Sequence, residues 1–543
     1  MTLTSRILGR LHRLPPRRYR ARVTRNIPVA MRDGVTLATD HFAPDDPGPH
    51  PTVVMRLPYG KRGFVGVGIL YAERGFHVVL QACRGTDRSG GHFDPLIHER
   101  ADGLDTLAWI KAQPWFDGRL GTNGPSYLGY TQWAICDALP EISAMSTKIT
   151  SAEFRSVVFP GGAVHLGLWL SWLQILESLR RSRFFTFRHM VSGDIDRRTL
   201  AASMTLPLLE ADVAAVGREV PFWRHWFNDA VDDGPFWHAM DHRHRIGADT
   251  PPNFFMSGWY DFMIDQLLRD YRALIDLGHK PHLTVGPWFH TSNMLQALSL
   301  KETLIWMRTH LLGDATGLRS KPVRLHISGD NHWRDFDAYP PGAPALRTLF
   351  PGLNHTLATE PPIASEPDSY TYDPADPTPN IGGAMFAFVG AGPKNNAGRE
   401  NRLDVLSYTS EVLDKPLTII GNCGLRLYAK ASVPHADFFV RLCDVSRRGV
   451  STNICDGLIR VTPDTPVTAD GWQLDISLHA TAHTFRPGHR LRLQISSGAH
   501  PRFARNLGTP DPIGSATRMV TNQIVIFHDA QRPTALTLPT YDI

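Results

Sequence analysis

Short apolar runs that alternate with helical segments constrain the fold of the first 335 residues more than any other feature of this sequence. Residues 52–56 and 77–81 are rich in β-branched side chains and bounded by turn residues, so each run predicts a buried strand. Residues 104–113 have the apolar spacing of a helix, and residues 253–257 and 282–285 predict two further strands. Strands that alternate with helices favour a mostly parallel sheet, covered on both faces.

Two other regions follow different patterns. Residues 150–245 contain no strand pattern, and the Leu and Trp residues between positions 166 and 176 are spaced as in a helix. After residue 335, Pro and Gly become frequent and apolar residues alternate with polar ones, which predicts an antiparallel β-sandwich. We therefore expect an α/β domain in two parts, a helical cap inserted between them, and a C-terminal all-β domain, with the boundaries 1–149, 150–245, 246–335 and 336–543.

Charge and cysteine content indicate which classes of partner and which cellular compartment to expect. The 57 Lys and Arg residues exceed the 52 Asp and Glu residues by five, a surplus too small at this length to indicate nucleic-acid binding. The five cysteines form no CxxC pair, which favours a reducing compartment, and we expect the protein to be cytoplasmic. The sequence shows no secretory signal and no apolar run long enough to span a membrane.

No cofactor is predicted, and a metal site is disfavoured. His238, His242 and His244 lie close together, but no Cys or suitably spaced acidic ligand accompanies them. At the N-terminus, Leu3, Ile7, Leu11 and Leu14 recur at helical spacing among eight arginines within the first 25 residues. Such a basic helix can contact a membrane surface, but the alternative of an arm that is docked or flexible is favoured, because two prolines follow it directly.

One hexapeptide is typical of a nucleophile elbow. In the run from Gly124 to Gly129, glycines lie two residues before and three residues after Ser126, which gives room for a sharp strand-to-helix turn. Residues 128–139 contain no proline and can form the helix that follows. Residues 119–123, where the preceding strand is needed, would not be predicted as a strand from their propensities.

Two further polar residues follow predicted strands that end in glycine. Asp261 comes after residues 253–257 and Gly258, and His290 comes after residues 282–285 and Gly286. The carboxyl ends of parallel strands gather at one edge of a sheet, and Ser…Asp…His is the chain order of α/β-hydrolase triads. Taken singly, Asp261 is better explained as a helix cap and His290 as a loop residue bonded to backbone, but the joint pattern reverses this preference and favours catalysis. Ser126 would be the nucleophile, His290 its base, and Asp261 the group that orients the histidine.

A hydrolase of this kind also needs donors for the oxyanion of the tetrahedral intermediate. The backbone N–H of Tyr127, directly after the serine, is the first candidate. The second should come from the loop after an early strand, residues 57–61, where Tyr59 offers a hydroxyl. From spacing alone, this Pro-Tyr-Gly sequence is equally well explained as an ordinary turn.

Motifs along nearly the whole chain resemble the cocaine-esterase-like branch of the X-prolyl dipeptidyl aminopeptidase superfamily. The most specific are the Ser126-Tyr127 pair and the Gly-Pro-Trp run at residues 286–288. The others are residues 31–37, 56–61, 84–91, 102–106, 113–115, 258–261, 404–406, 487–490 and 501–506. The resemblance implies an α/β-hydrolase with an inserted helical cap and a C-terminal jelly roll. It also implies a Ser126–His290–Asp261 triad, with Tyr59 and Tyr127 as the oxyanion hole.

The sequence differs from some members of this superfamily at positions that determine which acyl groups are accepted. Amino-ester hydrolases place an acidic pair after the triad aspartate to hold a substrate ammonium, but here Phe262 and Met263 follow Asp261. We therefore expect a serine hydrolase that cleaves uncharged or aromatic esters, or activated amides, through an acyl-enzyme. Expected pocket walls are Trp133, Trp169, Trp172, Trp259, Phe262 and Trp288, of which we expect two or three at the site.

Other functions stay open at this point. One alternative is an X-Pro dipeptidyl-peptidase or α-amino-acid ester hydrolase, and another is a non-catalytic protein that binds a ligand or glycan on a hydrolase scaffold. The expected partner is a small-molecule ester or amide. The oligomeric state is not predicted, although a homodimer would be unsurprising.

Overall fold

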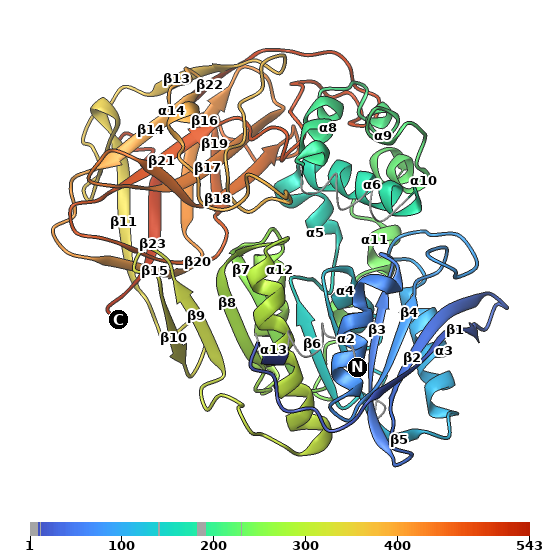
Figure 1. Ribbon diagram of the computed structural model, residues 1–543. Coiled ribbons are helices and arrows are strands. Elements are labelled where there is room, and N and C mark those ends of the chain that lie inside the picture. Colours follow the sequence, from blue (N-terminus) through green and yellow to red (C-terminus); the bar gives the residue numbers. More distant parts are fainter. Residues whose placement is uncertain (1–8, 11, 139–141, 182–191, 230) are drawn as a thin grey trace.

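The computed structural model describes residues 9–10, 12–138, 142–181, 192–229 and 231–543 (Figure 1). Most of the predicted N-terminal basic helix, including Leu3, Ile7 and Leu11, lies outside the described residues. No helix among the described residues is long and apolar enough to cross a membrane. All five cysteines are buried and unpaired.

A ten-stranded sheet forms the first half of the molecule. Its strand order is β1-β2-β4-β3-β5-β6-β7-β8-β9-β10, parallel from β4 through β9 and antiparallel at both ends. The strands are β1 (Ala21–Ala30), β2 (Thr36–Pro44), β3 (His50–Leu57), β4 (His77–Ala82), β5 (Phe116–Pro125), β6 (Ala144–Lys148), β7 (Asn253–Tyr260), β8 (His282–Phe289), β9 (Val323–Ile327) and β10 (His332–Phe336).

Helices cover both faces of this sheet, which explains the continuous apolar runs in its strands. One face packs against α3 (Glu99–Lys111), α4 (Tyr127–Trp133) and α12 (Ile264–Asp276), and the other against α2 (Val65–Ala72) and α13 (Asn293–Leu312). In β3, Val54 faces the first core, whereas Val53 and Met55 face the second. Side chains of both parities are therefore buried, as the predicted doubly wound α/β class requires.

Helical segments replace strands between β6 and β7. Above the sheet in Figure 1 lie α5 (Arg155–Val158), α6 (Leu166–Arg181), α8 (Asp194–Ser203), α9 (Ala211–Val216), α10 (Pro221–Arg224) and α11 (Pro235–Ala239). Their core is unusually aromatic and includes Trp169, Trp223, Trp226 and Trp237. These helices are the predicted cap.

The C-terminal half consists of two sheets that share β11 (Ala345–Gly352) and are antiparallel except where β12 pairs with β14. Across their interface, Leu425 of one sheet belongs to the same core as Leu493 of the other. The strands that follow β11 are β12 (Thr356–Ala358), β13 (Asp368–Tyr372), β14 (Val405–Ser410), β15 (Leu417–Gly421), β16 (Gly424–Ala431), β17 (Ala436–Val445), β18 (Ser451–Val461), β19 (Trp472–Ser477), β20 (Thr481–Phe485), β21 (Arg490–Ser496), β22 (Asn522–Phe527) and β23 (Ala535–Tyr541).

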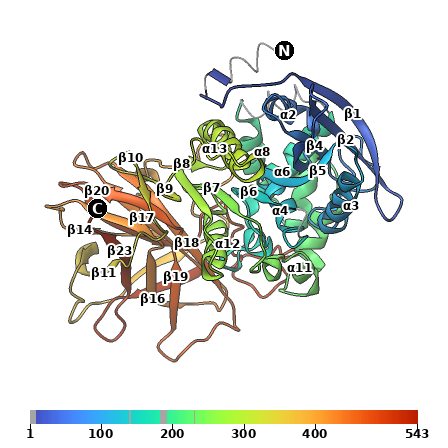
Figure 2. The same cartoon turned by 90° about the horizontal axis from the view of Figure 1, so that it is seen from below.

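The predicted fold class is thus confirmed: an α/β-hydrolase sheet with an inserted helical cap and a C-terminal β-sandwich. The two halves abut where β9 meets β20, and Figure 2 shows these strands side by side. The boundaries at residues 149, 245 and 335 stay a prediction.

Two local predictions around the elbow were wrong. Residues 119–123 belong to β5, a central strand between β3 and β6, although their propensities are poor. A Cβ at Gly121 would lie 2.7 Å from the sulfur of Met307, so the close approach of α13 requires the weak strand former at this position. The helix after the serine ends at Trp133, well short of the predicted residue 139.

Candidate active site

Ser126 lies at the sharp turn between β5 and α4. Its backbone has φ 56° and ψ −125°, a strained conformation for a residue that carries a side chain. A Cβ at Gly124 would lie 2.2 Å from Leu128, and one at Gly129 would lie 2.4 Å from Thr150. Both glycines are therefore required by close packing, with the second one residue later than in the usual G-x-S-x-G spacing.

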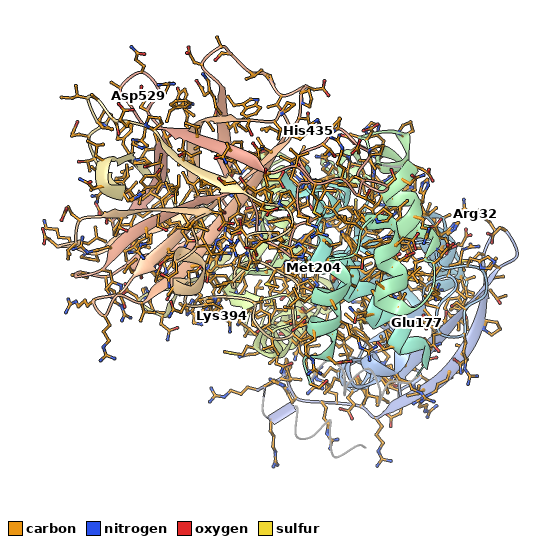
Figure 3. All side chains as sticks on the ribbon, turned by 90° about the horizontal axis from the view of Figure 1, so that it is seen from above. Arg32, Glu177, Met204, Lys394, His435 and Asp529 are labelled. Atoms are coloured by element: carbon orange, nitrogen blue, oxygen red, sulfur yellow. The ribbon has the colours of Figure 1, made fainter. Side chains whose placement is uncertain are left out.

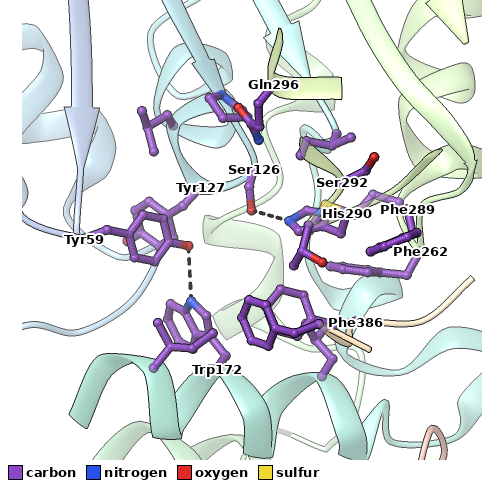
Figure 4. A pocket seen from close by; sticks show the side chains of 18 of the residues that line it. Tyr59, Ser126, Tyr127, Trp172, Phe262, Phe289, His290, Ser292, Gln296 and Phe386 are labelled. Carbon is purple, nitrogen blue, oxygen red and sulfur yellow. Dashed lines mark hydrogen bonds between the residues drawn. The ribbon is translucent and has the colours of Figure 1, made fainter. Parts of the chain in front are cut away.

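The three predicted polar residues meet at the carboxyl edge of the sheet. His290 Nε2 lies 3.0 Å from Ser126 Oγ (Figure 4). On the other side of the ring, His290 Nδ1 lies 2.7 Å from Asp261 Oδ2. Asp261 follows β7 and is fully buried, and its Oδ1 accepts a 2.8 Å hydrogen bond from the Met263 N–H.

This geometry determines the position of the imidazole proton. A carboxylate can only accept hydrogen bonds, so Nδ1 of His290 carries the proton that it shares with Asp261. Nε2 is then left with a lone pair to accept the Ser126 hydroxyl proton. The rings of Phe262 and Phe386 lie 4.5 and 5.6 Å from the imidazole and shield it. The arrangement can activate a serine hydroxyl by general-base catalysis.

Tyr59 presents its hydroxyl to the same cavity, from the loop after β3. Trp172 of the cap donates a 3.2 Å hydrogen bond from Nε1 to this hydroxyl oxygen. Burial raises the pKa of Tyr59 to about 12, although the hydrogen bonds with Trp172 and Ser126 act in the opposite direction. The hydroxyl therefore stays protonated at neutral pH. Because its oxygen already accepts the Trp172 N–H, its proton is available to an oxygen atom in the cavity.

Tyr127 supplies both a backbone and a side-chain function. Its N–H, in the first turn of α4, has no acceptor among the described residues and can bind an oxyanion. Its buried hydroxyl donates to Glu99 Oε1 at 2.8 Å and accepts the Leu96 N–H at 2.9 Å. Glu99 is in turn paired with Arg56 at 3.0 Å. Sequence analysis missed Glu99, because nothing in its spacing connects it to the serine.

A cavity of about 660 Å³ opens onto Ser126. Its walls come from all parts of the described chain: cap aromatic residues, the polar Ser292, Asn293 and Gln296 at the start of α13, and Phe386, Phe388 and Val389 from the C-terminal half (Figure 4). No Asp, Glu, Lys or Arg side chain is among the described residues that line it. Such a cavity suits an uncharged, largely apolar ligand.

Only half of the six predicted aromatic walls line this cavity. Trp169, Trp172 and Phe262 do. The other three candidates do not, in keeping with the expectation that two or three would lie at the site. Their rings pack in the cores on the two faces of the sheet: Trp133 lies 6.0 Å from Phe255, Trp259 donates to the His326 carbonyl, and Trp288 lies 5.5 Å from Trp333. Trp226, which was not predicted, lines the cavity instead.

Asp265, the acidic residue closest after Asp261 in the sequence, faces away from the cavity. Its carboxylate accepts the Ala480 N–H at 3.0 Å, lies 2.5 Å from His479 Nδ1 and accepts the Asn422 amide at 2.9 Å. It therefore ties α12 to the C-terminal half and is not available to bind a substrate ammonium group.

Lys148 carries a buried amine beside the elbow. Its carbonyl accepts the Ser126 N–H at 2.9 Å. Within the described part of the chain, its Nζ hydrogen-bonds to the neutral Asn123 and Thr303, at 2.6 and 3.2 Å. Burial lowers the pKa of Lys148 to about 7. Between pH 7 and about 10, the unfolded chain binds a proton at this lysine that the folded chain does not bind, so stability rises with pH.

Because of this lysine, we expect the free energy of unfolding to increase by up to about 1.4 kcal/mol for each pH unit above pH 7. Denaturation midpoints of the wild type and the Lys148→Met variant, compared from pH 7 to 9.5, would measure it. The wild type should gain stability relative to the variant as pH rises. A constant difference between the two proteins would contradict a neutral, buried amine.

Sequence comparison with known proteins identifies the family to which this chain is similar. Residues 33–292 match the family model of the X-Pro dipeptidyl-peptidases (S15 family), and residues 316–537 match that of the X-Pro dipeptidyl-peptidase C-terminal non-catalytic domain. Cocaine esterase from Rhodococcus sp. is 31% identical over 95% of this chain and 98% of its own length. A putative serine esterase from Mycobacterium tuberculosis is 24% identical over 90% of this chain and 92% of its own length.

Solved structures share the fold. An aminopeptidase from a marine sediment archaeon (Thaumarchaeota) superposes with a TM-score of 0.79 at 22% identity, over 97% of this chain and 98% of the other. An α-amino acid ester hydrolase superposes with a TM-score of 0.80 at 20% identity, over 96% and 97% of the two chains.

Proposed function

Since this chain belongs to the cocaine-esterase-like branch of the X-Pro dipeptidyl-peptidase (S15) superfamily, we propose that it is a serine hydrolase that cleaves uncharged carboxylic esters at Ser126. The observation that carries the proposal is the hydrogen-bonded series Ser126–His290–Asp261, with distances of 3.0 and 2.7 Å, at the base of an uncharged cavity.

In the acylation step, His290 Nε2 takes the Ser126 hydroxyl proton as Oγ attacks the ester carbonyl. The carbonyl oxygen becomes an oxyanion, which the Tyr127 N–H and the Tyr59 hydroxyl stabilise. When this intermediate collapses, the C–O bond to the alcohol breaks and His290 gives the proton to the departing oxygen. Water then attacks the acyl-enzyme by the same steps and releases the acid.

The cavity favours an aromatic or aliphatic acyl group without charge. Trp169, Trp172, Trp226 and Phe154 can pack against a flat ring, and no carboxylate is placed to pair with an α-ammonium group. Dipeptidyl-peptidase and amino-ester hydrolase activities, which both need a free α-amino group, are therefore disfavoured. The same mechanism can also cleave activated amides, because His290 can protonate a departing amine.

A matched pair of aryl esters tests this specificity. We expect kcat/KM to be about 10²-fold lower for an ester with a free α-amino group than for its N-acylated counterpart, because a buried ammonium would lack a counterion. The comparison should be made below pH 7, where the amine is charged. Equal or faster turnover of the free amine would favour the dipeptidyl-peptidase or amino-ester hydrolase alternative.

Tyr59→Phe is expected to lower kcat by about 10²-fold with little change in KM, because the lost hydroxyl bonds more strongly to the oxyanion than to the neutral ester. Trp172→Phe keeps an aromatic wall but removes the N–H that orients this hydroxyl, so a smaller fall in kcat, about tenfold, is expected. Steady-state kinetics on one neutral aryl ester measure both. An unchanged kcat in Tyr59→Phe would remove Tyr59 from the mechanism.

We further propose that the enzyme acts in the reducing environment of the cytoplasm. The supporting observation is that all five cysteine thiols are buried and unpaired.

A further inference from the structure

We infer that Ser365, in the C-terminal half, is a second nucleophilic serine, which accepts acyl or phosphonyl groups from small activated esters. It lies in the segment between β12 and β13, next to His528, which follows β22. Ser365 Oγ is 2.7 Å from His528 Nδ1, and His528 Nε2 is 3.0 Å from Asp368 Oδ2. These three residues repeat the hydroxyl–imidazole–carboxylate connectivity of the principal site, with the two ring nitrogens exchanged.

The proton positions in this second series follow from Asp368. Although burial acts in the opposite direction, hydrogen bonds from His528 and Tyr408 lower the pKa of this carboxyl, so it is ionised at neutral pH. Tyr408 donates to Asp368 Oδ2 at 2.8 Å, the oxygen that also lies near His528 Nε2. An ionised carboxylate accepts only, so a neutral His528 carries its proton on Nε2. Its Nδ1 is then the acceptor, and Ser365 must be the donor.

The site differs from a purely structural contact because Ser365 is only half-buried and lies in the wall of a cavity. Ser365 lines a surface cavity of about 510 Å³, together with Leu353, Ile363, Glu366, Asp529 and Arg532. His528 is only 1% exposed, so the serine separates the imidazole from the cavity. Figure 3 labels Asp529 on the side of the sandwich remote from the α/β sheet, which makes this cavity distinct from the one at Ser126.

In the proposed step, His528 Nδ1 takes the Ser365 proton while Oγ bonds to the carbonyl carbon or the phosphorus of the reagent. The leaving group departs with its bonding electrons, and His528 returns the proton to it. The backbone N–H of Glu366, directly after the serine, has no acceptor among the described residues and can stabilise the oxyanion. None of the described residues that line this cavity is a tyrosine that could act as Tyr59 does, so we expect modification about 10² to 10³ times slower than at Ser126.

A Ser126→Ala enzyme exposed to an excess of a small fluorophosphonate tests the inference. Intact-mass and peptide-mass measurements should show one slowly formed adduct, on the peptide that carries Ser365. The adduct should be absent from Ser126→Ala/Ser365→Ala and should persist in the matched control Ser126→Ala/Ser369→Ala, which changes an exposed serine of β13 nearby. Asp368→Asn, in the Ser126→Ala background, should slow labelling at least tenfold.

Absence of an adduct at Ser365 would overturn the inference and leave these contacts as a tie between the two segments. So would labelling at the same rate in the Asp368→Asn protein or in denatured protein. None of these outcomes bears on the principal site, because labelling and turnover at Ser126 are measured separately in the wild type.

Discussion

Replacing Ser126 by alanine is expected to lower kcat on a neutral aryl ester by about 10⁵- to 10⁶-fold. Without Oγ there is no acyl-enzyme, and His290 can only assist a direct attack by water on the ester. The imidazole still bonds to Asp261 at 2.7 Å, so the remaining geometry should be preserved. Burst and steady-state kinetics measure the loss, and the fluorophosphonate adduct on the peptide that carries Ser126 should disappear.

Ser126→Gly is the matched control for the fold. Its backbone φ of 56° is costly for alanine but not for glycine, so the glycine variant should be equally inactive and more stable than Ser126→Ala by about 1 kcal/mol. Turnover within tenfold of the wild type in either variant would refute Ser126 as the nucleophile. The same pair would favour the non-catalytic alternative only if the wild type also failed to hydrolyse esters and to react with the fluorophosphonate.

The parallel strands could be predicted from sequence because both of their faces are buried. Residues 52–56 and 77–81 each have three consecutive apolar residues at their centre, and each range lies within an observed strand whose residues are all buried. β5 could not be predicted, because it is stabilised by its position between β3 and β6 and carries Gly121 for the sake of α13. The strand propensities of residues 119–123 do not reflect such a packing requirement from a distant helix.

In the candidate site, too, some residues could be predicted from the sequence and others could not. Ser126, Asp261 and His290 each follow a strand of the same sheet, so the predicted strand ends and the chain order together indicated that they would meet. The support of Tyr59 by Trp172 joins positions 113 residues apart and arises only when the cap folds over the sheet. Likewise, Phe386 reaches the cavity from the C-terminal half. Among the predicted tryptophans, sequence could not separate cavity walls from core residues, because both environments are apolar.

Replacing Asp261 by asparagine is expected to lower kcat by about 10⁴-fold while the fold stays intact. Oδ1 of Asp261 accepts the Met263 N–H at 2.8 Å, so asparagine will keep its carbonyl oxygen there. Its NH₂ group must then face His290 Nδ1, which becomes an acceptor and moves the imidazole proton to Nε2. The tautomer that remains cannot take a proton from Ser126.

Asp265→Asn is the matched control, four residues further along the chain. Among the described residues, the Asp265 carboxylate bonds to Asn422, His479 and Ala480 of the C-terminal half and does not line the cavity. This variant should lose stability but keep a kcat within about threefold of the wild type. Kinetics of both variants on one neutral ester, beside their denaturation midpoints, separate a lost tautomer from a weakened fold. If Asp261→Asn retained full kcat, or if both variants lost activity in proportion to stability, Asp261 would have no orienting role, and His290 would be positioned by its packing against Phe262 and Phe386 alone.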